Sequence, residues 1–453
     1  MRSLWLMLPL LWSAALPAFG ADQPETGQVA ARGTLSLSLK RAVELASSPE
    51  GNTNIQLSGE ALKQAQSRSA EARAALLPDV EASVNEQNRT QNLAALGVQV
   101  NIPIPGFHFP TFVGPFTTMD ARVTGTQSVF DFASIRRFQA SKVGVSAAKS
   151  DVDSTQEQVA AQVARAYLAA LRARADVDTA QANVSLSQAV LTQAENQKKA
   201  GTGTGIEVTR SKVQLANDQQ HLLDSQNSRR SADLRLLRVI GLRLDTVVEL
   251  TDALRYVPVD AATIEQAKAQ AIQARPDYQA QRQREDTARL SANAVKMERL
   301  PSVAAFGDYG SIGTGVTSAL PTRTIGVSLR IPIFDGGRRD ARRAESASQY
   351  RAEQIRTSDL KEQIELDVRL ALDELQSADD QVKVAKDGLE LADSELTQAR
   401  RRYDAGVAAG LEVTDAQTRL ARARDNQTAA LYKYNVAQID LAQAMGKVRG
   451  SIQ

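Results

Sequence analysis

Residues Ala200–Ser211 read AGTGTGIEVTRS, with three glycines among small residues and a run typical of a helix directly after them. A glycine loop that opens a helix could bind an anion on its free backbone N–H groups. The dinucleotide fingerprint, however, needs a third glycine where Ile206 stands, and a P-loop needs a lysine that does not follow. Taken alone, the stretch is better explained as a sharp turn between two helices.

The same stretch occurs a second time, 205 residues further along the chain. Ala405–Ala416 reads AGVAAGLEVTDA, which repeats the Ala-Gly pair, the later glycine and the Glu-Val-Thr sequence. Other landmarks recur in the same order: Phe130-Asp131 returns as Phe334-Asp335, and Leu77-Pro78 returns as Leu300-Pro301. This self-similarity indicates a tandem duplication, so the glycine stretch marks the same turn in each copy.

A long heptad pattern precedes each copy of the turn. Apolar residues, many of them alanine, recur at steps of three and four over Val159–Ala194 and over Ile364–Ala399. A period of 3.5 residues is typical of left-handed coiled-coil packing. The pattern predicts one helix over 133–200 and another over 338–404, each ~100 Å long at the α-helical rise.

Shorter helices complete the predicted hairpins. A return helix of about half the length is expected after each turn, over 206–240 and 411–445. Two further helices, here called the upper helices because each leads into the strands of its copy, are expected over 57–76 and 276–300. A short helix should precede the second of them. The return helix 206–240 and the upper helix 276–300, placed end to end, would nearly match the long helix of the first copy.

Two segments alternate apolar and polar residues with the period of a β-strand, Thr324–Ile333 and Asp120–Val129, and weaker partners begin at Val80 and Val303. Strands of ~10 residues with one apolar face fit either a soluble core or the wall of an outer-membrane barrel. No other segment is suited to cover the apolar face, which favours the membrane. Four strands are too few to close a barrel, so several chains would have to contribute.

The first 20 residues have the pattern of a cleaved secretory signal peptide, with Arg2, an apolar core and a tolerable cleavage site at Ala18-Phe19-Gly20. No later apolar run has the length of a membrane-spanning helix. The chain contains no cysteine. We therefore expect no disulfide and no lipid-modified cysteine, so the protein should not be a lipoprotein.

Composition argues against catalysis, metal binding and nucleic-acid binding. A formal net charge of only +2 gives no support for a nucleic-acid partner. The two histidines, His108 and His221, are isolated, and no thiol is present. We expect a protein that is not an enzyme, with no catalytic residue, no metal site and no cofactor.

In these features the chain resembles the TolC family of outer-membrane channel proteins over nearly all of its length after the signal peptide. The marks of the resemblance are the two Ala-Gly turns followed by [IL]-Glu-Val-Thr, the Leu-Pro and Phe-Asp pairs, Ala274–Asp277 and Leu236–Leu242. The resemblance implies a homotrimer, with a β-barrel in the outer-membrane lipid and an α-barrel of helices in the periplasm. It implies an exit duct for efflux or type I secretion, docked to a periplasmic adaptor and an inner-membrane transporter.

The expected fold is mainly α with a small β part. Tandem-duplicated coiled-coil hairpins form the helical part, and four strands per chain contribute to the trimeric barrel. The expected organisation is a signal peptide over 1–20, a first repeat over 21–240 with a β-hairpin over 78–131, a linker over 241–261 at mid-length, a second repeat over 262–446 with a β-hairpin over 301–335, and a tail over 447–453. The glycine turns should lie at one end of the molecule and the strands at the other.

A second hypothesis remains beside the channel. The chain could be a periplasmic coiled-coil spacer or adaptor whose strands form a soluble sheet. The loop over 90–119 is also open to two interpretations. Its four phenylalanines, within a stretch without charged residues, fit an ordered extracellular loop with its own small core, or a cap over the exit.

The predicted functional residues lie at the turns. Five glycines are the expected docking tips for an adaptor: Gly201, Gly203, Gly205, Gly406 and Gly410. Glu412 and Asp415 lie three apart on one face in the first turn of a helix, where acidic residues complement the helix dipole by ~0.3–1 kcal/mol. The first copy has Glu207 and Arg210 at these positions.

The resemblance implies more for the second copy. Glu412 and Asp415 match the acidic positions that line the periplasmic aperture of the family, where three chains would form carboxylate rings favouring cations. Tyr403 matches a residue that helps to hold the closed state. The usual basic partner would fall at Ala408, so this lock should be weaker or made differently here.

Overall fold

The computed structural model describes residues 35–48, 50–98, 106, 110–258, 264–408 and 410–452. The signal peptide expected over 1–20 lies outside these residues. So do His108 and the middle of the 90–119 loop, and the expectation of a cap over the exit therefore stays an expectation.

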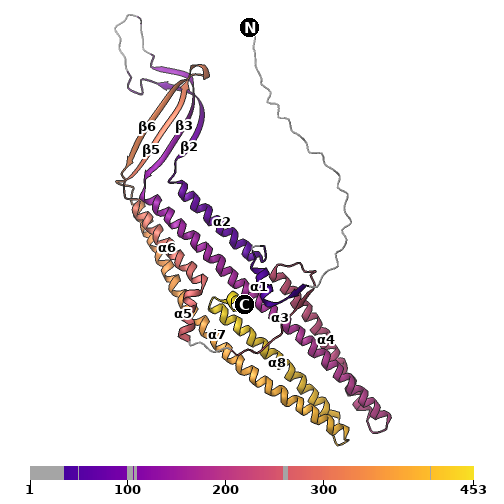
Figure 1. Ribbon diagram of the computed structural model, residues 1–453. Coiled ribbons are helices and arrows are strands. Elements are labelled where there is room, and N and C mark those ends of the chain that lie inside the picture. The colour runs from indigo at the N-terminus through magenta and orange to yellow at the C-terminus, as the bar shows by residue number, and fades with distance from the viewer. Residues whose placement is uncertain are drawn as a thin grey trace, which may run out of the picture.

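Two long helices, α3 (Phe132–Lys199) and α7 (Arg338–Asp404), run along most of the molecule (Figure 1). Each is followed by a return helix, α4 (Gly205–Ile240) after α3 and α8 (Gly410–Ala444) after α7. All four helices begin and end within one residue of the predicted bounds. The predicted pair of long helical hairpins is confirmed.

Two upper helices, α2 (Thr53–Ala74) and α6 (Pro276–Met297), lie on the side of the strands, away from the glycine turns (Figure 1). The short α5 (Ile264–Ala274) leads into α6. Helix α6 packs between the two long helices: Ser150 Oγ of α3 donates to Gln283 Oε1 at 3.0 Å, and Gln281 Nε2 donates to Glu353 Oε2 of α7 at 2.8 Å. Helix α6 therefore connects the two hairpins.

The four long strands form one antiparallel sheet at the end opposite the glycine turns, as predicted (Figure 1). They are β2 (Asp79–Asn92), β3 (Phe112–Phe130), β5 (Ser302–Gly313) and β6 (Leu320–Arg330), and the 3₁₀ turn η1 (Val316–Ser318) connects the last two. The order is β2-β3-β5-β6. The pairing of β3 with β5 joins the two copies and leaves β2 and β6 as the edges.

The prediction of a strand over Thr324–Ile333 is partly wrong, because β6 ends at Arg330. Arg330 is paired with Ser302, the first residue of β5. Beyond it, Pro332 has no N–H with which to continue the hydrogen-bond ladder. The apolar face of the strand therefore ends earlier than the alternation suggests.

The expected stacking of the short helices is also wrong. The end of α4 meets the start of α2, not α6: Asn52 Nδ2 donates to the Val239 carbonyl at 2.7 Å. A Cβ on Gly241 would lie 2.5 Å from the Gly51 carbonyl oxygen. In the second copy the end of α8 meets the start of α6, where a Cβ on Gly446 would lie 2.8 Å from Arg275 Cα. Each return helix is thus stacked on the upper helix that precedes the same copy's strands.

Several small elements near mid-length were not expected from the sequence. Strand β1 (Leu35–Leu37) pairs in parallel with β4 (Val248–Leu250). Helix α1 (Leu39–Ser47) follows β1, and the four-residue α9 (Val448–Ser451) ends the described chain. Together these elements cover the middle of α3.

Tyr167 of α3 is the largest side chain buried in this mid-length core. Its hydroxyl donates to the Leu37 carbonyl at 2.8 Å and contacts Asp252 Oδ2 at 2.7 Å, and Asp252 also accepts from the Leu39 N–H. Glu157 of α3 accepts from the Val448 N–H at 2.7 Å. Through these hydrogen bonds, the buried Tyr167 and Glu157 connect the N-terminal, linker and C-terminal segments to helix α3.

Within the described part of the chain, no helix combines the length and the apolar character that a membrane span would need.

We predict that Gly446→Ala destabilises the protein by about 1–3 kcal/mol, because Gly446 has a left-handed φ of 67° and no room for a Cβ. The measurement is the apparent melting temperature of the helical circular-dichroism signal in detergent. Gly388→Ala is the control. Gly388 lies within α7 with nothing within 4 Å of an added Cβ, so this change should be neutral or stabilising by up to about 1 kcal/mol. Equal melting temperatures for the two variants would contradict the stacking contact.

Candidate functional site at the glycine turns

Both glycine turns end their long helix in the same way. Gly201 follows α3 with φ 73°, and Gly406 follows α7 with φ 72°. In each turn the next N–H reaches back to the helix: Thr202 donates to the Gln197 carbonyl and Val407 to the Arg402 carbonyl, both at 3.0 Å. This is the left-handed glycine termination of a helix, which a residue with a Cβ adopts only with strain.

The other three predicted glycines differ from one another. A Cβ on Gly203 would lie 3.0 Å from Gln197 Cβ, so a larger residue at this position would crowd the end of α3. A Cβ on Gly410 would be in ordinary contact with Tyr403 at 3.5 Å, and a longer side chain would meet its ring. Gly205 has only Lys198 Nζ at 3.9 Å. The sequence therefore grouped glycines with different structural roles.

Tyr403, in the last turn of α7, is buried among apolar side chains of α3, α7 and α8. Its hydroxyl donates to Gln197 Oε1 of α3, so it joins the second copy to the first. Burial, and after it the nearby Glu207 carboxylate, raises the pKa of the Tyr403 hydroxyl above its ordinary value. The hydroxyl therefore keeps its proton and remains a donor at neutral pH.

Four of the predicted residues line one small cavity between the two hairpins: Glu207, Arg210, Tyr403 and Gly410. Glu207 Oε2 also accepts from the backbone N–H of Thr204 at 3.0 Å, which is the reciprocal bond of a capping box. In the first copy, then, the acidic residue caps a helix and faces the contact with the second copy.

The acidic pair of the second copy is arranged differently. Glu412 Oε1 lies 3.3 Å from Arg402 Nε on α7, and both side chains are substantially exposed. Asp415 is exposed and forms no salt bridge among the described residues, but Arg419, which is bound to Glu395, lies near enough to interact with its charge. An exposed pair of this kind contributes about 0–1 kcal/mol. Arg402, which the sequence did not single out, is thus the basic partner of Glu412.

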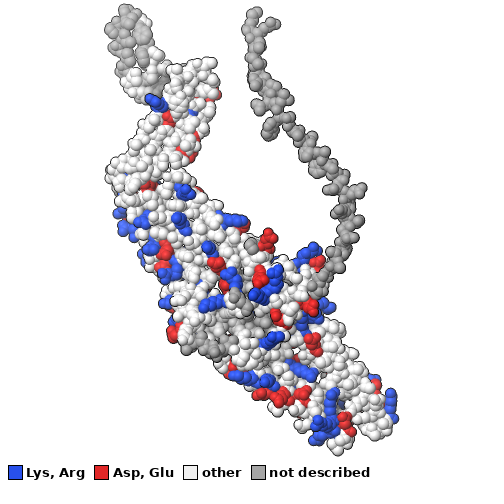
Figure 2. Space-filling view, in the orientation of Figure 1, with Lys and Arg blue, Asp and Glu red and all other residues white. Residues whose placement is uncertain are grey.

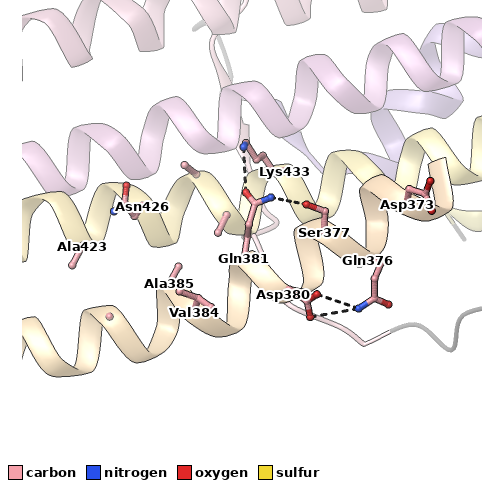
Figure 3. A pocket seen from close by; sticks show the side chains of 13 residues that line it. Asp373, Gln376, Ser377, Asp380, Gln381, Val384, Ala385, Ala423, Asn426 and Lys433 are labelled. Carbon is pink, nitrogen blue, oxygen red and sulfur yellow. Dashed lines mark hydrogen bonds between the residues drawn. The ribbon is translucent and has the colours of Figure 1, made fainter. Parts of the chain in front are cut away.

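The sequence also did not indicate a groove of about 890 Å³ between α7 and α8 (Figure 3). Small residues on both helices leave it open: Ala385, Gly388, Ala423 and Ala429. Across it Lys433 donates to Gln381 Oε1 at 3.2 Å. An alanine-rich face was the available signal, but in the sequence it could not be distinguished from close helix packing.

The described residues contain no group of three histidine or acidic side chains that could hold a metal ion. The features of the turns are instead a left-handed glycine termination of each long helix, a tyrosine that connects the two hairpins and a partly paired acidic face.

The sequence is similar to those of outer-membrane efflux and secretion proteins. The family model for "outer membrane efflux protein" matches residues 49–242 and 268–447. The chain is 24% identical over 393 residues to the pyoverdine export outer membrane protein OpmQ of Pseudomonas putida, covering 85% of this chain and 81% of OpmQ. It is 21% identical over 319 residues to the alkaline protease secretion protein AprF of Pseudomonas aeruginosa, covering 69% of this chain and 66% of AprF.

The fold is similar to that of solved outer-membrane channels. The crystal structure of the outer membrane protein VceC of Vibrio cholerae matches with a TM-score of 0.75 and 18% identity, over 90% of this chain and 96% of that one. The family model matches well over half of the chain, on both sides of the linker. The chain belongs to the outer membrane efflux protein family, as the resemblance to TolC-type channels predicted.

Proposed function

We propose that the protein is one subunit of a trimeric duct that crosses the outer membrane and the periplasm. It would serve as the passive exit of an efflux or type I secretion system, and it would not be an enzyme. Its relatives include a protein named for pyoverdine export and one named for protease secretion. What such proteins share is the duct, so the duct is the function that we propose.

The observation that carries the proposal is the exposed apolar face of the sheet. This face, here called the apolar face, includes Val84 at 69% and Ile325 at 84% exposure. On the opposite, polar face the central strands are partly covered, with the Asp308 side chain 17% exposed, while the edge strands are exposed on both faces. Figure 2 shows few charged side chains over the strands and many over the helices. Such a distribution suits a wall with lipid outside and water inside.

The edges of the sheet support assembly from several chains. In one chain, β2 and β6 each have an unpaired edge. In a lipid environment an unpaired backbone N–H or C=O costs several kcal/mol, so the edges need partners. Pairing β6 of one subunit with β2 of the next would supply them, and three subunits are what the resemblance implies.

The glycine turns then become the periplasmic end of the duct. They lie at the opposite end from the sheet, and Gly201 and Gly406 have open space where a Cβ would stand. An adaptor helical hairpin could therefore approach the turns closely, and behind the adaptor an inner-membrane transporter would deliver the cargo. A cleaved signal peptide over 1–20 would bring the chain to the periplasm.

Membrane fractionation tests the duct against the soluble spacer. We expect the full-length protein, expressed in a Gram-negative host, in the detergent-extractable outer membrane as a heat-resistant trimer. The reason is that the exposed apolar face needs lipid. Recovery as a monomer in the soluble periplasmic fraction would contradict the duct and support the spacer.

Export tests the glycine turns. Gly406→Leu should abolish export while trimers and membrane insertion remain, because the left-handed turn at the tip would change shape. Gly144→Leu is the control. Gly144 also has open space around an added Cβ, but it lies near the strand end of α3. The measurement is export by the host, with trimer content determined in parallel. Export at the level of the parent protein would count against docking at the turns.

Conductance in a planar bilayer tests the aperture. The double variant Glu412→Ala with Asp415→Ala should reduce cation selectivity and block by multivalent cations, because it removes two carboxylates from each subunit. The matched control is Glu390→Ala with Asp393→Ala, which removes an exposed acidic pair of the same spacing from α7. If both double variants conduct like the parent, Glu412 and Asp415 are helix-terminal acids and do not line an aperture.

A further inference from the structure

A cluster of three charged side chains connects the two copies within the sheet. Arg122 of β3 donates from Nε to Asp120 Oδ1 at 2.9 Å and from Nη1 to Asp308 Oδ1 of β5 at 3.2 Å. Its Nη2 lies 2.7 Å from Asp120 Oδ2. All three side chains are less than one-third exposed. The guanidinium thus binds one carboxylate on its own strand and one on the neighbouring strand.

Strand register places this cluster on the polar face. Asp308 is paired with Thr124, and Arg122 with Gly310. Directly paired residues share a face, and successive residues alternate between faces. The neighbouring Val123 is paired with Tyr309 and therefore lies on the apolar face. In the proposed duct, the cluster faces the water-filled interior.

Gly310 makes this arrangement possible. A Cβ on Gly310 would lie 2.4 Å from Arg122 Cβ and 2.5 Å from the Ala121 carbonyl oxygen. Only glycine leaves the space in which the Arg122 side chain crosses to the neighbouring strand. The close approach of β3 and β5 and the position of the guanidinium therefore depend on the same residue.

The local charge on the polar face is acidic. Glu81 is paired with Thr124, so it lies in the same row of the sheet as Asp308. Three successive rows, ~13 Å of strand, then hold three carboxylates and one guanidinium. The other basic residues on this face lie further along the strands, Arg89 toward one end and Arg330 at the other.

We propose that Arg122 sets the ionic selectivity of the strand-lined part of the duct, distinct from the aperture at the glycine turns. Its guanidinium neutralises part of the negative charge that these carboxylates place beside the pore. It also holds the carboxylates of Asp120 and Asp308 against the sheet. Without it, three unpaired carboxylates per subunit face the water and attract cations. The inference rests on the proposed function, because it needs a conducting duct.

The test is the reversal potential of the full-length trimer in a planar bilayer with a potassium chloride gradient. Arg122→Gln should raise the cation-to-anion permeability ratio by about 2–10-fold, since it removes a positive charge from each subunit next to the pore. Asp308→Asn should lower the ratio. Arg122→Lys keeps the charge and loses the two-carboxylate geometry, so it should conduct like the parent even where trimer stability falls.

Arg323→Gln is the matched control, because it removes the same charge from the other face of the sheet. Arg323 of β6 is paired with Tyr309 on the apolar face and is exposed. This variant should keep the selectivity of the parent. An unchanged ratio in Arg122→Gln, or an equal shift in Arg323→Gln, would overturn the inference while leaving the duct intact. Absence of channels with the parent protein would instead contradict the proposed function.

Discussion

The contact on which the architecture depends is the meeting of each return helix with the start of an upper helix. Gly241 touches the backbone at Gly51, and Gly446 touches the backbone at Arg275. Because neither glycine carries a Cβ, the two short helices approach end to end without a gap. A stacked pair then serves as a single partner for a long helix. Neither short helix is long enough to cover a long helix alone.

The large elements could be predicted because each has a strong periodic signal. The heptads of α3 and α7 extend over many turns, and the repeated glycine turn fixes where each helix ends. The alternation in β3 and β6 identified the apolar face of the sheet, although it did not identify the end of β6. That end depends on Pro332 and on where β5 begins, which is information from another strand.

The missed features depend on contacts between residues far apart in the chain. Strands β1 and β4 have three residues each and pair across more than 200 positions. A strand of three residues is too short to show a periodic hydrophobic pattern in the sequence. The choice of α2 rather than α6 as the partner of α4 likewise depends on contacts between distant residues, Gly241 with Gly51 and Asn52 with Val239. At the candidate site, the glycines and Tyr403 were visible in the sequence. Arg402 as the partner of Glu412, and the cavity shared by the two hairpins, were not.

The single-chain sheet also has a consequence for biogenesis. A single chain has two unpaired strand edges, which disfavour the lipid, and a broad apolar face, which disfavours water. Insertion and subunit association would then be one process, whose rate rises steeply with the concentration of subunits. If the chain is exported and assembles as proposed, its sheet is prone to pairing with unrelated strands until both edges have met a neighbouring subunit.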